Sequence, residues 1–179
     1  MKARKVKGLD PGGPLADNAE RIVLTRLDEL CGFMPAAEDP AASEALHDMR
    51  IAAKRLRYVL EVTGGCFGPY ASKAVDHVKD LQDVLGEIHD CDVHLPETAA
   101  FLAELVGADV AAVAAGRPAP NRAAYAGLVA LEVELRARRE RCFAAFLAQW
   151  ADLERKGFRA RLEYAVTERA GDAIIGRES

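Results

Sequence analysis

A row of basic side chains on one predicted helix is the feature of this sequence best suited to chemistry. Within LHDMRIAAKRLRYVLE, residues 46–61, a period of about 100° per residue predicts a core stripe of Met49, Ala53, Leu56 and Leu60. A second stripe holds His47, Arg50, Lys54 and Arg57. Positive charges at these spacings repel one another, so helix stability gains nothing from them. One interpretation is a charged face in contact with water. The other is that an anionic ligand neutralises the stripe.

Two more arginines occupy positions where the helical pattern requires apolar residues. Arg26 falls in the apolar stripe of a helix predicted over residues 15–33, and Arg139 in that of a helix predicted over residues 122–150. A bare guanidinium facing a core is costly, so each must be paired or must face a wet cavity. A side chain that extends to the surface is the alternative. Both arginines favour a basic site shared between helices.

Carboxylates follow in the next predicted helix, VDHVKDLQDVLGEIHDCDVHLP, residues 75–96. Lys79, Asp83, Gly86 and Asp90 share the face next to its apolar stripe. We expect Asp83 and Asp90 each to hold an arginine of the preceding helix by a bidentate contact. A glycine inside a helix costs about 1 kcal/mol relative to alanine, so the sequence predicts a close approach of the neighbouring helix at Gly86.

Apolar residues at helical spacing, with no alternating strand pattern, predict an all-α fold, an antiparallel bundle of about five helices. A basic non-helical arm covers residues 1–14, the bundle residues 15–168 and a flexible tail residues 169–179. The predicted helices span residues 15–33, 43–63, 71 to beyond 94, 122–150 and 152–168, with a loop over 34–40 and a break over 107–121. Pro96 is expected to bend or restart the third helix.

The overall composition narrows the class of protein. The 179 residues are 50% apolar and 29% charged, which is typical of one globular domain. A formal net charge of −4 argues against a protein that coats nucleic acid. The four cysteines form no C-x-x-C pair, which favours buried free thiols over a metal site. No apolar run resembles a membrane span or a secretory signal, so we expect a cytoplasmic protein without a membrane partner.

Two segments, residues 46–61 and VKDLQDVLGEIHDCDVHL over residues 78–95, resemble the CHAD family, the conserved histidine α-helical domain. The opening VKGLDPGGPLADNAERIVLTRLDEL, residues 6–30, is similar to the family's entry into its first helix. The positions that match the family pattern are His47, Arg50, Lys54, Arg55, Arg57, Tyr58, Leu81, Gln82, Leu85, Gly86, Asp90, Asp92 and Val93.

The resemblance implies a helical bundle whose basic channel binds inorganic polyphosphate, often at polyphosphate granules, without enzymatic activity, cofactor or metal. The polyphosphate contacts that it implies here are His47, Arg50, Lys54, Arg55 and Arg57, with walls formed by Arg26, Lys79, Arg136 and Arg139. Tyr58, Asp83, Asp90 and Asp92 would support these side chains without touching the ligand. His77, His89 and His94 have no assigned task and are expected to pack between helices or lie at the surface.

This chain departs from the family in one respect, because it carries a single copy of a basic helix that family domains commonly have twice. A one-sided groove would leave a long polyanion half uncovered, so we favour a homodimer over a half-domain that acts alone.

Two other functions fit parts of the sequence. An HD-type metal phosphohydrolase would use His47-Asp48 and His89-Asp90, followed by Asp92 and His94, but a basic stripe is a poor setting for a divalent cation. A helical adaptor would dock a protein through RARRER, residues 136–141, although Arg138 and Arg141 are expected to pair with nearby glutamates. Nucleic acid is not expected as a partner, since the basic faces offer no aromatic platform for bases.

Overall fold

The structure, a computed structural model, describes residues 2–169. Its elements are α1 (Leu15–Cys31), α2 (Met34–Ala37), α3 (Ser43–Thr63), the 3-10 turn η1 (Gly64–Cys66), α4 (Tyr70–Ala114), α5 (Arg122–Arg155) and α6 (Phe158–Ala165). Apart from the single turn α2, five helices form the described chain, which confirms the all-α prediction. The described residues contain no strand, and an isolated bridge joins Phe67 to Arg169.

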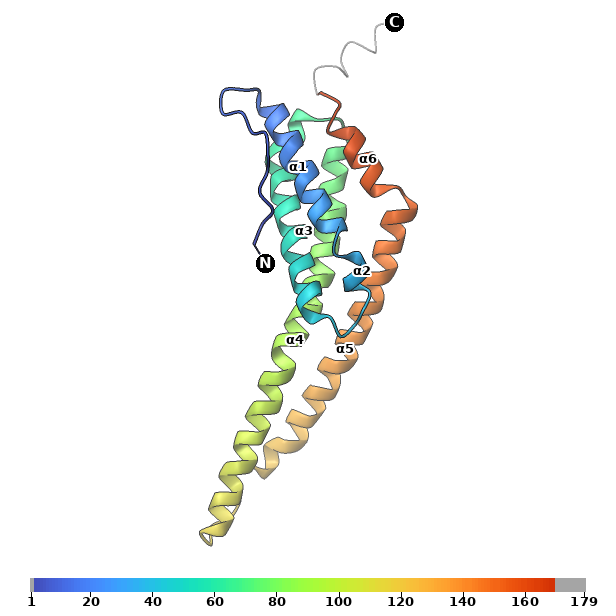
Figure 1. Cartoon of the computed structure of the whole chain (residues 1–179). Helices are drawn as coiled ribbons and strands as arrows, with labels where there is room; N and C mark the ends of the chain where they lie inside the picture. Colours follow the sequence, from blue (N-terminus) through green and yellow to red (C-terminus); the bar gives the residue numbers. More distant parts are fainter. Residues whose placement is uncertain (1, 170–179) are drawn as a thin grey trace, which may run out of the picture.

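The helices divide into a bundle and a projecting hairpin (Figure 1). In the bundle, α1, α3 and α6 pack around the first part of α4 and the last part of α5. Beyond the bundle, α4 and α5 continue side by side as a long antiparallel pair. The bundle core is formed by fully buried side chains of all five helices, including Val23, Leu27, Leu30, Met49, Leu56, Leu60, Leu81, Leu85, Ile88, Phe146 and Leu162.

The prediction of a break over residues 107–121 is wrong at its beginning, because α4 runs on to Ala114. Pro96 lies inside α4 and does not restart it, since one lost backbone hydrogen bond can be tolerated in a helix packed along its length. The turn is fixed instead by Asp109, which accepts hydrogen bonds from the Asn121 backbone at 3.1 Å and from the Tyr125 hydroxyl at 2.6 Å. The residues predicted to be a loop at 34–40 begin with α2.

Both ends of the described chain lie against the bundle. Residues 2–14 form no helix, and the Arg4 backbone N–H donates to Glu29 of α1 at 2.6 Å. Arg169, the first residue of the expected tail, pairs with Asp17 and Glu20 of α1. The rest of that tail, residues 170–179, lies outside the described residues.

The four cysteines are free thiols, as expected, but only Cys91 is buried and the other three are half-buried. Burial raises the pKa of the Cys31 thiol to about 11, and nearby Arg159 opposes this shift. No helix in the described part is long and apolar enough to cross a membrane.

Candidate anion-binding face

The basic stripe of α3 lies on the outer side of the bundle, as its periodicity requires. Met49, Ala53, Leu56 and Leu60 are buried, which confirms the predicted core stripe of this helix. On the stripe itself, His47, Arg50 and Arg57 are half-buried and Lys54 is exposed. We call these four residues, His47, Arg50, Lys54 and Arg57, the basic face. Its side chains are therefore available to a ligand while their stems pack against the neighbouring helices.

Gly86 of α4 makes room for Arg50. A Cβ atom on residue 86 would lie 3.5 Å from Arg50 Nε, the nearest atom of any other element. Arg50 Nε is itself buried and has no hydrogen-bond partner in the described chain. The close approach predicted from this glycine is thus made by a side chain of the neighbouring helix, and it places the guanidinium of Arg50 against α4.

Because 3.5 Å is an ordinary van der Waals distance, we expect Gly86→Ala to fit without moving Arg50. The variant should gain up to about 1 kcal/mol in unfolding free energy, since glycine is the weaker helix former. Urea denaturation followed by circular dichroism measures this change. A loss of stability would mean that α3 and α4 are packed too closely for even a methyl group.

Tyr58 organises two cations of the basic face. The Arg57 guanidinium carbon lies 4.9 Å from the centre of the Tyr58 ring, and Lys54 Nζ lies 5.8 Å from it. Both distances allow a cation–π attraction. Arg57 Nε also forms an ion pair with Glu61 at 3.1 Å, although without hydrogen-bond geometry. The supporting role predicted for Tyr58 thus has a physical basis in its contacts.

A histidine pair closes one end of the basic face. His47 Nδ1 of α3 and His89 Nδ1 of α4 lie 3.2 Å apart, and the two ring centres are 4.5 Å apart. Burial lowers the pKa of His89, and the neighbouring His47 and Arg50 lower it further, whereas Asp90 and Asp92 raise it. Sequence reasoning left His89 without a task because the pairing depends on how α3 and α4 align. The expectation was either packing between helices or a place at the surface, and His89 lies between the helices.

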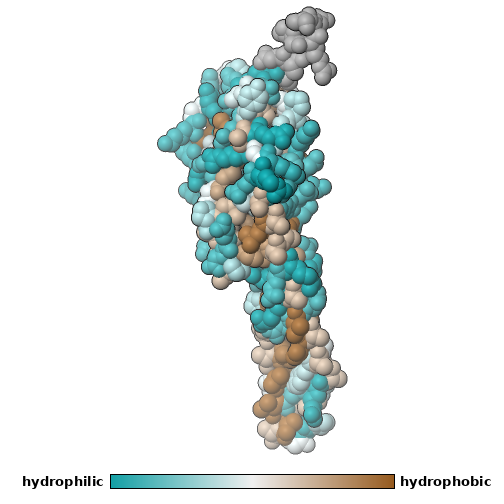
Figure 2. Space-filling model, turned by 90° about the vertical axis from the view of Figure 1, so that its right-hand side faces the viewer, coloured by the Kyte–Doolittle hydropathy of each residue, from teal (hydrophilic) through white to brown (hydrophobic). Residues whose placement is uncertain are grey.

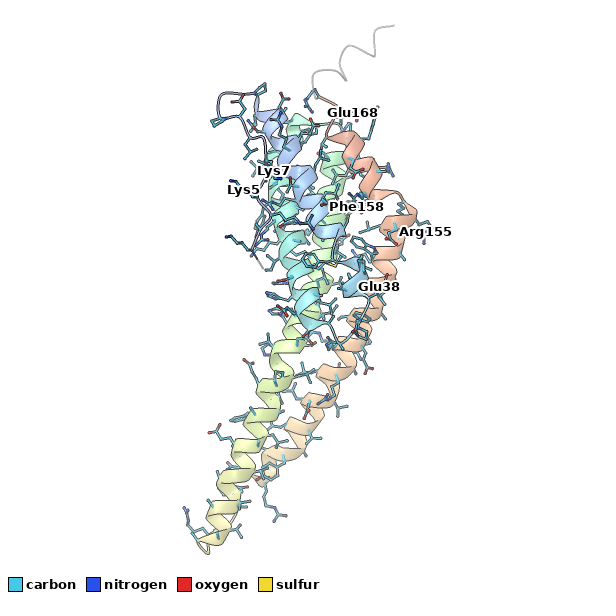
Figure 3. The ribbon with its side chains drawn as sticks, viewed as in Figure 1. Lys5, Lys7, Glu38, Arg155, Phe158 and Glu168 are labelled. Atoms are coloured by element: carbon cyan, nitrogen blue, oxygen red, sulfur yellow. The ribbon has the colours of Figure 1, made fainter. Side chains whose placement is uncertain are left out.

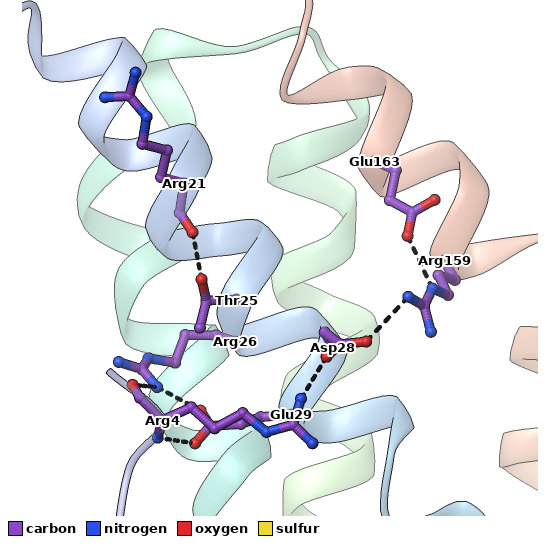
Figure 4. Close-up of polar contacts among 8 residues, drawn as sticks. All are labelled: Arg4, Arg21, Thr25, Arg26, Asp28, Glu29, Arg159 and Glu163. Atoms are coloured by element: carbon purple, nitrogen blue, oxygen red, sulfur yellow. Dashed lines mark hydrogen bonds and ion pairs between the residues drawn. The ribbon is translucent and has the colours of Figure 1, made fainter. Parts of the chain in front are cut away.

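On the other flank of α3, the buried carboxylate of Glu29 gathers basic groups (Figure 4). Glu29 is 2% exposed, and Arg26 Nη1 donates a hydrogen bond to its Oε2. The Arg4 backbone N–H donates to Oε1, and Arg55 Nη1 lies 3.9 Å from the same oxygen. Of the alternatives for Arg26, pairing is therefore the one realised. Arg26 and Arg55 lie together here, separated from Arg50 and Arg57 by the width of α3.

The N-terminal arm adds cations that sequence reasoning did not include in the site. Arg26 Nη1 donates to the Arg4 carbonyl at 3.0 Å, which holds the arm along α1. Lys5 and Lys7 on this arm are exposed, and both lie beside α1 and α3 (Figure 3). The four basic residues within the first seven were a signal in the sequence, but only the contacts with Glu29 and Arg26 place them near α3.

The four arginines in residues 136–141 of α5 are neutralised by carboxylates of the same chain. The pairs are Arg136 with Glu132, Arg138 with Glu87, Arg139 with Asp92, and Arg141 with Glu134. Arg139 also donates to the Pro40 carbonyl at 2.8 Å, so it joins α5 to α4 and to the α2–α3 loop. Arg136 and Arg139 therefore do not join the basic face through any contact in the described chain. Arg138 pairs across to α4, not with a glutamate of its own helix as expected.

The carboxylates of α4 behave differently from one another. Asp92 forms an ion pair with a basic group, Arg139. The expectation that Asp83 and Asp90 hold arginines of α3 is wrong, because neither forms an ion pair or hydrogen bond within residues 2–169. Asp83 lies about 60° beyond Gly86 around the helix, and so it faces water. Lys79 is likewise exposed and unpaired in the described chain.

The predicted groove is not visible as a hollow. Four hollows in the described surface are lined by other residues, at the α1–α5–α6 junction, beside α6, on the hairpin and under the arm. The basic face lines none of these four hollows. No group of three His, Cys, Asp or Glu side chains within residues 2–169 has the geometry to hold a metal ion.

These features define a class: a helical bundle that presents a half-buried basic face on one helix, with a histidine pair at its end. The family model of the CHAD domain matches residues 3–97, which is more than half of the 179 residues. The chain therefore belongs to the CHAD domain family. The matched region contains the arm, α1, α2, α3 and the part of α4 that carries Gly86 and His89, and it ends before the hairpin. No curated protein and no solved structure matches the chain.

Proposed function

We propose that the basic face binds inorganic polyphosphate and that the chain acts as a binding module, not as an enzyme. The observation that carries the proposal is a difference in charge pairing. Arg50 and Lys54 have no carboxylate within ion-pair distance in the described chain, whereas each of the four arginines in residues 136–141 of α5 has one. A bundle that leaves these two α3 cations without counter-charges retains them for an external anion.

The chemistry of polyphosphate suits this face. The ligand carries about one negative charge per phosphate, and its binding follows the rules of a nucleic-acid backbone without bases. Arginine forks contact two phosphate oxygens at once, while the exposed Lys54 acts as a mobile point charge. The stripe from His47 to Arg57 extends about 15 Å along α3, which is long enough for several phosphates. Arg55, Lys79 and the arm lysines flank it.

RNA is a weaker fit than polyphosphate. Proteins that bind single-stranded nucleic acid without sequence preference stack bases on exposed aromatic rings. The aromatic ring at the basic face is Tyr58, and it already has Arg57 and Lys54 over it.

The test is a titration of the full chain with long-chain polyphosphate at 50 mM and 200 mM salt. Four phosphate contacts at a slope of about −0.7 each predict that the affinity falls about 50-fold between these concentrations. Size-exclusion chromatography in parallel reports the oligomeric state of the protein. Absence of binding at 50 mM salt, or an affinity independent of salt, would refute the proposal.

The histidine pair predicts a pH dependence of polyphosphate binding. The pKa of His89 lies below its ordinary value of 6.5 in the free protein, chiefly through burial and then through His47 and Arg50. A bound polyanion stabilises the imidazolium and raises this pKa, so binding takes up a proton. Affinity should therefore rise as the pH falls below about 7, by at most about tenfold per pH unit, and level off below the pKa of the free protein.

Binding measured from pH 8 to pH 5.5 checks this dependence. His89→Gln should flatten the profile, whereas His94→Gln should not, because His94 is exposed and pairs with Glu97 outside the basic face. If affinity depends on pH with the same slope in the wild type and in His89→Gln, the proton taken up on binding belongs to another group.

We also propose that the chain is cytoplasmic and associates with polyphosphate granules. Fluorescently tagged protein should then colocalise with stained granules, and a variant without Arg50 and Arg57 should become diffuse. A tagged wild type that stays diffuse in cells rich in granules would contradict this location.

A further inference from the structure

The hairpin of α4 and α5 is a rigid element whose surface has almost no charge. Its turn is held by Asp109, which is buried and accepts hydrogen bonds from Asn121 and Tyr125. From residue 98 to residue 131 the charged residues are Glu104, Asp109, Arg117 and Arg122. No third element of the described chain packs on this part of the pair, which projects alone from the bundle (Figure 1).

Valine side chains form an exposed row on each helix of the hairpin. On α4 they are Val106, Val110 and Val113, which are 41%, 64% and 59% exposed at i, i+4 and i+7. On α5 they are Val129 and Val133, which are 49% and 62% exposed. We call these five valines the apolar face. Figure 2 shows that apolar residues run down the hairpin while the bundle above is mainly hydrophilic.

The two rows of valine side chains are exposed on the same side of the hairpin. A shallow hollow is lined by Val106, Val110 and Val113 together with Arg122 of α5. At 100° per residue, Arg122, Val129 and Val133 lie within about 40° of one another on α5. The α5 row therefore continues the surface that begins at this hollow.

The size of the apolar face suits a protein interface. Its five valines are each 41–64% exposed, and a standard interface buries roughly 800 Å² per partner. Monomeric soluble proteins rarely leave so large a contiguous apolar patch in water. Two helices alone also bury only one side of each helix, and a second pair would complete a four-helix arrangement.

Two charges at the ends of the α5 row identify the partner as a second copy. Arg122 and Glu140 are 18 residues apart, which is five turns of an α-helix, so both lie on the line of Val129 and Val133. Neither Arg122 nor Glu140 forms an ion pair in the part of the chain that the structure describes. The pairs 122–140 and 129–133 share the same midpoint, residue 131. An antiparallel copy would thus place Arg122 opposite Glu140 and Val129 opposite Val133.

We propose that the apolar face binds a second copy of this chain around a two-fold axis, with the two α5 helices antiparallel. Each Arg122 then pairs with Glu140 of the other copy, and Val129 and Val133 of both copies are buried between the two α5 helices. This self-complementary arrangement is the one a two-fold interface requires. This dimer places the two bundles at opposite ends, so it does not join the two basic faces into one groove as the homodimer expected from the single basic helix would, and it does not depend on polyphosphate binding.

Sedimentation equilibrium of the full chain, without polyanion, tests the dimer. The wild type should be a dimer that persists at 0.5 M salt, because most of its interface is apolar. Val129→Glu should weaken association at least about 100-fold, since it buries a charge opposite Val133. The matched control is Leu131→Glu, which is 47% exposed on the opposite side of α5 and should leave the dimer intact. Circular dichroism should show unchanged helicity in both variants.

Charge reversal tests the antiparallel pairing at two exposed positions where folding is not at risk. Arg122→Glu and Glu140→Arg should each weaken the dimer about tenfold at low salt, and the double variant should restore it. A wild type that stays monomeric at all concentrations overturns the proposal, as does a dimer that Val129→Glu leaves unchanged. A dimer that is insensitive to both charge reversals overturns the antiparallel pairing.

Discussion

Replacement of Arg50 and Arg57 by alanine in one variant is expected to weaken polyphosphate binding at least about 100-fold. Hydrogen bonds to charged groups contribute about 1.5–3 kcal/mol each. The variant removes the guanidinium groups of two arginines, and with them their bidentate hydrogen bonds to phosphate, from the basic face. The slope of log affinity against log salt should become shallower by about 1.4–1.8, since two phosphate contacts are lost. Titration with long-chain polyphosphate over a series of salt concentrations measures both quantities.

The matched control removes two arginines from α5. Arg136 and Arg141 are exposed, and each has a glutamate of its own helix as a partner. Arg136→Ala combined with Arg141→Ala changes the net charge by the same amount, but we expect binding to stay within about twofold, because long-range charge is screened. Equal losses in the two variants would show that total charge, not the basic face, determines affinity.

The Arg50 and Arg57 variant should also keep its fold. Arg50 Nε has no partner in the described chain, so its removal leaves no carboxylate unpaired. Arg57 releases Glu61, which is exposed and can be hydrated. Unchanged helicity and melting temperature would separate loss of contacts from loss of structure.

The helical period explains how much of α3 could be predicted from the sequence. Once a segment is helical, 100° per residue fixes which side chains face the core, and Met49, Leu56 and Leu60 are buried as predicted. The same rule grouped the four basic residues into one stripe. What the period cannot give is the alignment of one helix along another. The contacts of Arg50 with Gly86 and of His47 with His89 depend on that alignment.

The charges of α5 show the same limit more clearly. Sequence spacing suggested that Arg138 pairs within its helix, yet its partner is Glu87, 51 residues away on α4. Arg139 was predicted to line the site, but Asp92 and the Pro40 carbonyl bind its guanidinium. A guanidinium can reach several carboxylates, and tertiary packing determines which it meets. Apolar burial is therefore easier to predict than the pairing of long charged side chains.

Glu29→Ala is expected to lower the free energy of unfolding by about 3–5 kcal/mol, the typical cost of leaving a buried charge without its partner. Glu29 is 2% exposed and Arg26 is 13% exposed, so water replaces the lost carboxylate poorly. The Arg4 backbone N–H also loses its acceptor. Urea denaturation followed by circular dichroism measures the change.

The neighbouring residue supplies the control for Glu29. Asp28 pairs with Arg4 and with Arg159, but its side chain is 53% exposed. Because exposed ion pairs contribute at most about 1 kcal/mol, Asp28→Ala should change the unfolding free energy by no more than that. A similar cost for Asp28→Ala and Glu29→Ala would mean that burial does not determine the strength of these pairs.

A double-mutant cycle then separates the pair from the single charges. Glu29→Ala leaves Arg26 buried and unpaired, whereas Arg26→Ala with Glu29→Ala removes both charges. The double variant should therefore be less destabilised than the sum of the single variants, by about 1–3 kcal/mol. Strict additivity would mean that Arg26 finds another partner when Glu29 is absent. Glu29 also accepts a hydrogen bond from the arm and lies near Arg55. The polyphosphate affinity of the same variants should therefore be measured as well. A loss of affinity would mean that this network positions cations for the ligand, and an unchanged affinity that it only stabilises the bundle.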